Sequence, residues 1–268
     1  ENPAYDVTPL SRAGDYGDAE GLAWLAEVSD VITYEFENVP VVTALQLGHS
    51  TTVRPGPRAL EVAQDRLVEK RFITEAGLPV VPHREVDTAD DLHAAMAALK
   101  SPAILKTRRL GYDGKGQVVI APGDDPRAAM AELANAPCVL EERVAFVGVL
   151  SVIVVRAHNG QGVAYDVPEN EHSGGILRRS SVPSRFDGDL KAEAVRMAKH
   201  LANKLDYVGV LAVEFFVAPE AEAPLLINEI APRVHNSGHW TMDACVCEQC
   251  ENHIRAIAGW PRGDTTRL

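Results

Sequence analysis

Two spacings of apolar residues divide this chain into expected strands and helices. Short apolar runs bounded by turn residues predict strands, and apolar residues about three or four positions apart predict helices. The expected strands are 30–36, 52–55, 80–86, 103–108, 117–121, 138–144, 150–157, 162–167, 175–182, 208–217 and the run that begins at Leu226. The expected helices are 19–28, 57–76, 88–99, 126–135, 187–205 and 240–258. Strands outnumber the helices that could cross between them, so an α+β fold with a largely antiparallel sheet is favoured over a parallel, Rossmann-type core.

The strand that begins at Leu226 runs into a dense group of polar residues. Within 228–241 the chain carries a carboxylate, a guanidinium, amides, imidazoles and hydroxyls. An unpaired polar group costs about 1–3 kcal/mol when it is buried, so burying all of them would be strongly destabilising. This segment is therefore expected to face a polar ligand.

Two glutamates interrupt neighbouring apolar strands. Glu214 lies in 208–217 and Glu229 lies in the strand that follows, so the two side chains are candidates to lie side by side. Adjacent carboxylates need a cation between them, and with the amide of Asn228 they suit Mg²⁺ held together with substrate phosphates. The alternative is structural: a buried Glu214 paired with Arg233 or another base.

The charge of the chain restricts its partners. It has 26 Lys and Arg against 38 Asp and Glu, a formal net charge of −12, which argues against a general binder of nucleic acids or of anionic membranes. A phosphate site must therefore be local, and 106–109 with Lys115 are the candidates. No apolar run could span a membrane and residues 1–30 lack a signal-peptide pattern, so a cytoplasmic protein with reduced thiols is expected.

A glycine-rich loop joins two expected strands. Its glycines, Gly111, Gly114 and Gly116, permit positive φ angles and close approach of backbone N–H groups to phosphate oxygens. The loop does not end as a Walker motif does and does not open a helix, so a flexible flap is expected. An ordinary hairpin with a long turn is the alternative, although the flanking Lys106 and Lys115 favour phosphate.

The strand 138–144 ends in two acidic residues, Glu141 and Glu142. In a nucleotide site such a segment can be the hinge whose backbone meets the adenine edge. Taken alone, it can equally be a plain strand end.

Together these segments resemble the ATP-grasp superfamily: a flap on a strand pair, a hinge after the next strand, and metal-binding carboxylates on two later strands. Four stretches narrow the resemblance to the N5-carboxyaminoimidazole ribonucleotide synthetases: 33–40, 64–70, 111–117 and 228–241. The resemblance covers nearly the whole chain. It implies an ATP-grasp fold, α+β with α/β parts, in which a largely antiparallel sheet and a smaller α/β subdomain follow the remainder of a Rossmann-like domain.

The resemblance also implies a domain organisation. Residues 1–56 would be the remainder of the N-terminal pre-ATP-grasp domain and 57–268 the ATP-grasp domain, with a lid subdomain at about 80–143. The family's first segment and its C-terminal domain are missing from the pattern, so a chain truncated at both ends is expected. The family resemblance further suggests a homodimer.

The resemblance assigns site residues by kind of ligand. For ATP it implies Arg66, Lys106, Gly111, Tyr112, Asp113, Gly114, Lys115, Gly116, Gln117, Glu141, Glu142, Arg143, Val144, Val149, His172, Asn228 and Glu229. For catalysis it implies Tyr112, Asp113, Lys115 and Arg233, and for Mg²⁺ it implies Glu214 and Glu229. For bicarbonate and the ribonucleotide it implies Glu35, Glu37, Arg233, His235, Asn236 and Ser237. By itself, a histidine such as His172 is more often a surface residue.

The implied reaction is the ATP- and bicarbonate-dependent carboxylation of 5-aminoimidazole ribonucleotide in purine biosynthesis. Bicarbonate is a poor electrophile until it is phosphorylated. Mg²⁺, Lys106 and the flap amides would stabilise charge on the transferred γ-phosphoryl group, giving carboxyphosphate and ADP. Carboxyphosphate, or CO₂ from it, would carboxylate the exocyclic amine while the closed flap excludes water.

Two places depart from the family. The family usually has Glu where Val149 stands, to accept hydrogen bonds from the ATP ribose, so nucleotide binding weaker by about 1.5–3 kcal/mol per lost bond is expected. Cys245, Cys247 and Cys250 replace residues that are usually a threonine or serine and an aromatic. Cys247 and Cys250 are expected on one helix face near His253, where zinc is an alternative to small core residues.

Two other functions stay open. One is another ATP-grasp ligase, of the formate-dependent glycinamide ribonucleotide transformylase or biotin carboxylase type, although 34–40 and 233–241 argue against it. The other is a nucleotide-binding remnant without turnover, which Val149 and the expected truncation suggest.

Overall fold

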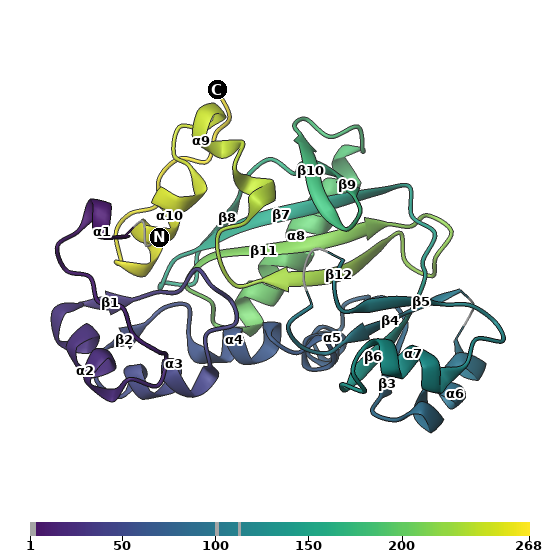
Figure 1. The fold of residues 1–268 in the computed structure, drawn as a ribbon. Coiled ribbons are helices and arrows are strands. Elements are labelled where there is room, and N and C mark those ends of the chain that lie inside the picture. Colours follow the sequence, from purple (N-terminus) through teal and green to yellow (C-terminus); the bar gives the residue numbers. More distant parts are fainter. Residues whose placement is uncertain (1–3, 100–101, 112–113) are drawn as a thin grey trace.

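The computed structural model describes residues 4–99, 102–111 and 114–268. The chain forms an N-terminal part, a small sheet with two helices, and a large sheet (Figure 1). In Figure 1 the N-terminal part and the small sheet lie below opposite ends of the large sheet, and the C-terminal helices lie above the N-terminal part. None of the described helices is long and apolar enough to cross a membrane.

The large sheet is antiparallel and carries most of the core. Its order is β10-β9-β7-β11-β12, and β8 pairs with β7. The strands are β7 (Gly148–Arg156), β8 (Gly162–Ala164), β9 (Glu169–Ser173), β10 (Ile176–Ser181), β11 (Gly209–Val217) and β12 (Leu225–Ala231). Apolar residues of one face, such as Leu211 and Phe215, pack against α8 (Gly188–Lys204) and are fully buried. This confirms the expectation of a largely antiparallel α+β fold.

The opposite face of the large sheet carries Glu214, one of the two predicted metal ligands. Val210 and Ala212 of β11 pack there with residues of the C-terminal region, including Ala256. Side chains alternate between the faces of a strand, so Glu214 leaves the sheet on this second face.

The small sheet has its own core. Its order is β3-β6-β4-β5, all antiparallel. Its elements are β3 (His83–Val86), α6 (Ala89–Ala98), β4 (Ala103–Thr107), β5 (Gln117–Ile120), α7 (Pro126–Glu132) and β6 (Cys138–Glu142). Thr88 and Asp91 cap α6 reciprocally, which defines where this helix starts.

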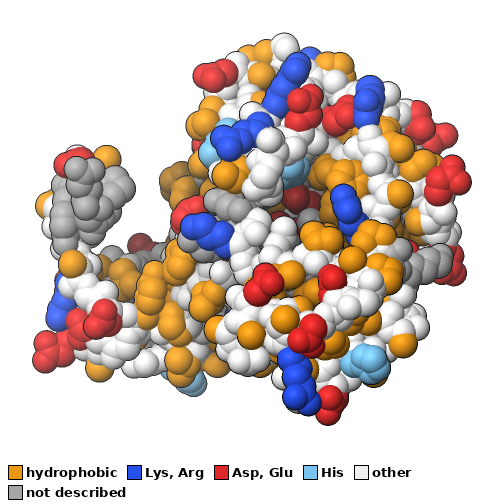
Figure 2. Space-filling view, turned by 45° about the vertical axis from the view of Figure 1, so that its right-hand side comes forward, with side chains coloured by type: hydrophobic (Ala, Val, Ile, Leu, Met, Phe, Trp, Pro, Cys, Tyr) orange, Lys and Arg blue, Asp and Glu red, His pale blue; other side chains and the backbone are white. Residues whose placement is uncertain are grey.

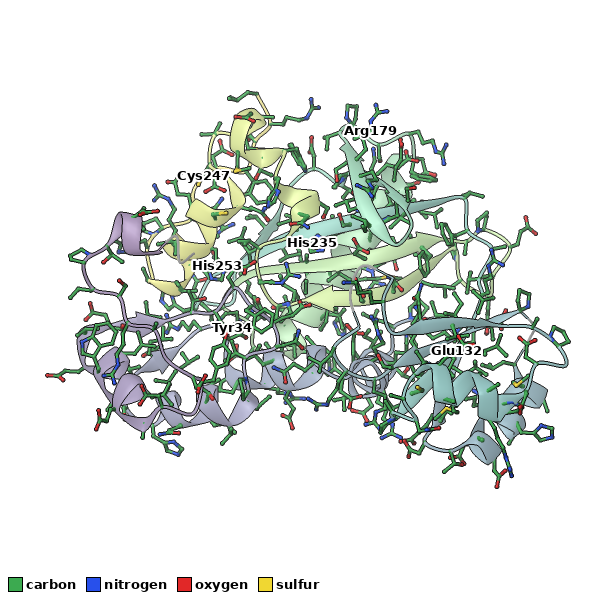
Figure 3. The ribbon with its side chains drawn as sticks, viewed as in Figure 1. Tyr34, Glu132, Arg179, His235, Cys247 and His253 are labelled. Atoms are coloured by element: carbon green, nitrogen blue, oxygen red, sulfur yellow. The ribbon has the colours of Figure 1, made fainter. Side chains whose placement is uncertain are left out.

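The N-terminal part is a short α/β arrangement. It contains α1 (Ala4–Val7), α2 (Ala19–Val28), β1 (Val31–Ile32), α3 (Val41–Gly48) and the parallel partner of β1, β2 (Thr52–Val53). The strand expected at 30–36 is therefore shorter than predicted. The N-terminal part contacts the C-terminal region, because Thr33 Oγ1 lies 2.8 Å from His253 Nε2. Figure 3 shows His253 and Tyr34 at this junction.

Two helices that the sequence predicted as continuous are broken. The helix expected at 57–76 is α4 (Pro57–Ala63) and α5 (Arg66–Glu75), because the Asp65 carboxylate accepts hydrogen bonds from Leu67 and Val68 and starts a new helix. The helix expected at 240–258 is α9 (Thr241–Ala244) and α10 (Gln249–Ile257), with Glu248 as the N-cap of the second. Strand β9 was missed, because its sequence is polar.

The second break changes the interpretation of the cysteines. Cys247 is buried and precedes α10, whereas Cys250 is exposed within it, so they do not share a helix face as expected. His253 uses both ring nitrogens, since Nδ1 accepts from Val210 N–H at 3.1 Å and Nε2 contacts Thr33. Within the described residues no group of three or more His, Cys, Asp or Glu could hold a metal ion.

Candidate active site

A cavity of about 970 Å³ lies on the second face of the large sheet. Its lining comes from the N-terminal part, from α5, from the flap between β4 and β5, and from β7, β9, β10, β11 and β12. Figure 2 shows a face on which acidic and basic side chains gather around a hollow. The cavity therefore joins all three parts of the molecule.

Glu214 and Glu229 lie opposite each other on β11 and β12, as the sequence predicted. The register shifts directly after this pair, because Phe215 pairs with Ile227 and Asn228 forms the bulge. Burial, and then the charge of Glu229, raise the pKa of Glu214 to about 8. The pair therefore carries fewer than two negative charges at neutral pH until a cation joins it.

Positive groups surround Glu229. Arg66, the first residue of α5, donates from Nη1 to Glu229 Oε2 at 3.3 Å. Burial acts to raise the pKa of Glu229, but the charges of Arg66 and Lys106 lower it. Glu229 is therefore the ionised member of the pair.

Glu214 has no ion pair with a lysine or an arginine in the part of the chain that the structure describes. Arg233 donates from Nε to Glu37 at 3.1 Å, so the alternative pairing of Glu214 with Arg233 is wrong. Among the described residues the ion-pair contact of Glu214 is with His172 Nε2, at 4.0 Å. Burial lowers the pKa of His172, which favours its neutral form.

Glu141 binds two lysines. Its Oε2 accepts from Lys106 Nζ at 2.7 Å and its Oε1 lies 3.0 Å from Lys70 Nζ. Glu141 and Lys70 are 2% and 1% exposed. Burial acts against ionisation, yet the two lysines lower the pKa of Glu141 to about 2. Because Lys106 lines the cavity, the ionised Glu141 fixes the position of a cavity cation.

The flap borders the cavity beside Arg66. Arg66 Nη2 donates to the carbonyl of Gly111 at 3.3 Å. Gly116 has a φ of +70°, and a Cβ there would lie 2.7 Å from Thr107 Oγ1, so glycine is required. This hairpin connection therefore brings backbone close to the cationic side of the cavity.

An apolar wall forms another part of the cavity lining. Phe146 and Phe216 stack with ring centroids 4.6 Å apart, and Val149 pairs with Phe216 across β7 and β11. Val149 is 6% exposed and its other cross-strand partner is Asn170. Flat apolar surfaces of this kind accommodate a planar ring.

The structure brings most predicted site residues together. Those that line the cavity are Glu37, Arg66, Lys106, Gly111, Gly114, Lys115, Gln117, Val149, His172, Glu214, Asn228, Glu229, Arg233, His235 and Asn236. Described residues outside this lining are Glu35, Gly116, Glu141, Glu142, Arg143, Val144 and Ser237. Tyr112 and Asp113 lie outside the described residues.

Glu69 is a cavity residue that the sequence pattern did not predict. It is 2% exposed, accepts a hydrogen bond from Ile230 N–H at 2.6 Å, and lines the cavity. Burial raises its pKa to about 8, with Lys70 opposing the shift. Glutamates on helices are usually exposed to solvent. The one feature that could have pointed to Glu69 is that it stands beside Lys70 in a helix whose other buried residues are apolar.

Comparison with known proteins gives the family. The ATP-grasp domain model matches residues 71–250, and the ribonucleotide synthetase preATP-grasp domain model matches residues 1–64. The N5-carboxyaminoimidazole ribonucleotide synthase of Brucella melitensis biotype 1 is 49% identical over 267 residues, which are 99% of this chain and 73% of that protein. This chain belongs to the N5-carboxyaminoimidazole ribonucleotide synthase family.

Solved N5-carboxyaminoimidazole ribonucleotide synthetases share the fold. An ADP complex of one has a TM-score of 0.93 and 43% identity, with 99% of this chain and 70% of that one covered. The Aspergillus clavatus enzyme, in complex with ADP and 5-aminoimidazole ribonucleotide, has a TM-score of 0.88 and 26% identity, with 97% and 68% covered. As a member of the N5-carboxyaminoimidazole ribonucleotide synthase family, the chain is an ATP-grasp ligase that uses ATP.

Proposed function

We propose that this chain carboxylates 5-aminoimidazole ribonucleotide to N5-carboxyaminoimidazole ribonucleotide, using ATP and bicarbonate, in purine biosynthesis. The observation that carries the proposal is the facing pair Glu214 and Glu229 in a cavity that also holds Arg66, Lys106 and Arg233. Paired carboxylates with cations nearby suit a nucleotide phosphate chain and a second anion. The family membership of the chain supplies the choice of substrates.

In this proposal the paired glutamates hold Mg²⁺. Carboxylate oxygens are the ligands that Mg²⁺ prefers, and two of them suffice when phosphates and waters complete the shell. The fit rests on charge: burial, and then the neighbouring carboxylate of Glu229, raise the pKa of Glu214, and a divalent cation would stabilise both carboxylates in their ionised form. When bound, Mg²⁺ would neutralise phosphate charge during transfer.

Lys106, Arg66 and the flap would bind the ATP phosphates. Lys106 is oriented by Glu141, so its ammonium presents a fixed charge to the cavity. Gly111 to Gln117 would close over the phosphates and exclude water from the phosphorylated intermediate. Tyr112, Asp113 and Lys115 of this segment would contribute to ATP binding and to catalysis.

The adenosine would lie along the apolar wall. The backbone of 141–144 would meet the adenine edge, while the side chain of Glu141 serves the lysines. His172 and Val149 would border the ribose. Because valine cannot accept a hydrogen bond, this end of the site would hold nucleotide weakly.

Bicarbonate and the ribonucleotide would occupy the side of the cavity near Arg233. Arg233, His235 and Asn236 would bind anionic oxygens, Ser237 would act through His235, and Glu37 orients Arg233. Carboxyphosphate formed from ATP and bicarbonate would deliver its carboxyl group to the exocyclic amine, with phosphate as the leaving group. Glu35 would approach the ribonucleotide from the N-terminal part.

A coupled assay of ADP release tests the function. Turnover is expected with bicarbonate plus aminoimidazole ribonucleotide, and none with formate plus glycinamide ribonucleotide or with neither addition. Turnover with formate would show that the chain is an ATP-grasp ligase of the formate-dependent type. ATP binding without any turnover would show that it is a nucleotide-binding remnant.

We also propose a domain division, an oligomeric state and a cellular location for this protein. Residues 1–56 and 57–268 would form the two domains, with the lid at about 80–143. The protein would be a cytoplasmic homodimer. Sedimentation of the purified chain tests the assembly, since a monomer at micromolar concentration would contradict it.

A further inference from the structure

A chain of hydrogen bonds between side chains crosses the large sheet and ends on His235. Ser180 Oγ lies 2.8 Å from Asn170 Oδ1, and Asn170 Nδ2 lies 2.9 Å from Ser151 Oγ. Ser151 Oγ lies 2.6 Å from Ser237 Oγ, which lies 2.8 Å from His235 Nδ1. Ser151, Asn170 and Ser237 are buried, so these bonds are shielded from bulk solvent.

The direction of every bond follows from one backbone group. The backbone N–H of Ser237 donates to His235 Nδ1 at 3.3 Å, and an N–H can only donate. Nδ1 therefore carries no proton, and the Ser237 hydroxyl must also donate to it. That hydroxyl has then used its proton, so it accepts from Ser151. Ser151 in turn accepts from the Asn170 amide, whose oxygen accepts from Ser180.

The proton of the neutral imidazole is therefore on Nε2. His235 lines the cavity, and Nε2 has no hydrogen-bond partner among the described residues. Burial lowers the pKa of His235 to about 4, and Arg233, His172 and His239 add to the effect while Glu229 opposes it. At neutral pH the ring presents an N–H donor to the cavity.

We infer that Ser151 and Asn170 are positioning residues that hold His235 as a neutral hydrogen-bond donor toward an oxyanion in the cavity. The inference rests on the proposed function for the identity of that oxyanion, an oxygen of bicarbonate or of the acyl phosphate formed from it. A preorganised donor stabilises charge that develops on such an oxygen. With Nε2 protonated and Nδ1 saturated by two donors, His235 does not take the proton of the attacking amine.

The tautomer can be measured without any substrate. The full chain is labelled with ¹⁵N-histidine, and the ring nitrogens of His235 are assigned from the spectrum of His235→Asn. The expected wild-type spectrum has a protonated Nε2 and an unprotonated Nδ1 at pH 7. A protonated Nδ1, or an imidazolium at pH 7, would overturn the inference whether or not any variant folds.

Asn170→Asp tests the direction of the chain. A carboxylate only accepts, so it would draw the Ser151 proton away from Ser237, which then donates to Ser151. His235 Nδ1 would then keep only the Ser237 backbone N–H as a donor, so it stays unprotonated and its ¹⁵N resonance should move toward that of a less strongly hydrogen-bonded nitrogen. Ser184→Ala is the matched control, since it removes a buried hydroxyl that has no partner among the described residues. An unchanged Nδ1 resonance of His235 in folded Asn170→Asp would refute the positioning role.

Kinetics separate this inference from the proposed function. In the carboxylation assay Asn170→Asp should lower kcat roughly tenfold to a hundredfold, because a donor that is no longer held in place stabilises the transition state less well. Ser184→Ala should match wild type. If wild type shows the expected tautomer without carboxylation, the proposed function fails and the positioning of His235 stands.

Discussion

Lys106 Nζ lies 2.7 Å from Glu141 Oε2, and this contact links a cavity cation to a carboxylate that is almost wholly buried. Lys70 lies on the other side of the same carboxylate, at 3.0 Å, and is itself buried. The buried carboxylate of Glu141 therefore compensates the charge of Lys70 and orients Lys106. Removing this carboxylate should affect both the stability of the protein and its ATP binding.

We expect Glu141→Gln to destabilise the protein by about 3–5 kcal/mol, because Lys70 would be left as an uncompensated buried charge. ATP affinity should fall too, since Lys106 loses its orienting partner. Urea unfolding and calorimetric titration with ATP measure the two effects. Glu132→Gln, at the exposed end of α7, is the control and should leave both close to wild type. Equal unfolding midpoints for the two variants would contradict the ion-pair assignment.

Glu229→Gln should abolish Mg²⁺-dependent ATP turnover while the protein stays folded. The amide keeps the shape of the side chain but removes the charge that a divalent cation needs. ADP release across a Mg²⁺ titration, with circular dichroism as the folding check, measures this. Glu193→Gln on α8, where the glutamate pairs with exposed Arg196, serves as the control. Wild-type turnover of Glu229→Gln at saturating Mg²⁺ would remove this glutamate from the metal site.

Val149→Glu should tighten ATP binding, tenfold for each roughly 1.4 kcal/mol recovered, because a carboxylate at the cavity wall can accept from the ribose hydroxyls. Val149→Gln is the matched control and should recover less, since it lacks the charge. Calorimetric ATP affinity and thermal midpoint are measured on both variants. A large fall in midpoint without any gain in affinity would mean that Val149 packs purely as part of the apolar wall.

Protonation of His253 should make the protein less stable in mild acid. The ring is buried, and burial lowers its pKa to about 4 in the folded state, against about 6.5 when unfolded. Above about pH 6.5 neither state binds the proton, so this group has no effect on stability there. As pH falls from about 6.5 toward 4, only the unfolded state binds it, and stability falls by up to about 1.4 kcal/mol per pH unit.

His253→Gln isolates this contribution. The variant should lose less stability between pH 7 and pH 5 than wild type does, because its side chain does not titrate. His93→Gln on α6, well away from the junction, is the control for general effects of removing a histidine. Urea midpoints at the two pH values provide the measurement, and identical pH slopes in wild type and His253→Gln would contradict the assignment.

Local sequence determined the acidic pair. Glu214 and Glu229 interrupt runs of apolar residues, and strands consecutive in sequence usually pair, so their proximity was predictable. The glycine-rich flap was predictable for a similar reason, since Gly116 at positive φ is a local requirement. The largely antiparallel architecture followed from the number of strands relative to helices.

Tertiary structure decided the rest. The break before Arg66 needs the Asp65 cap, which a continuous helical pattern conceals, and Arg108, directly after β4, binds that same carboxylate. Strand β9 is polar and exists because β7 and β10 pair with it. The partners of Glu141, and the serine and asparagine that reach His235, are distant in sequence and carry no periodic signal. Sequence patterns report local backbone preference and burial, whereas the pairing of buried polar groups depends on which segments the fold brings into contact.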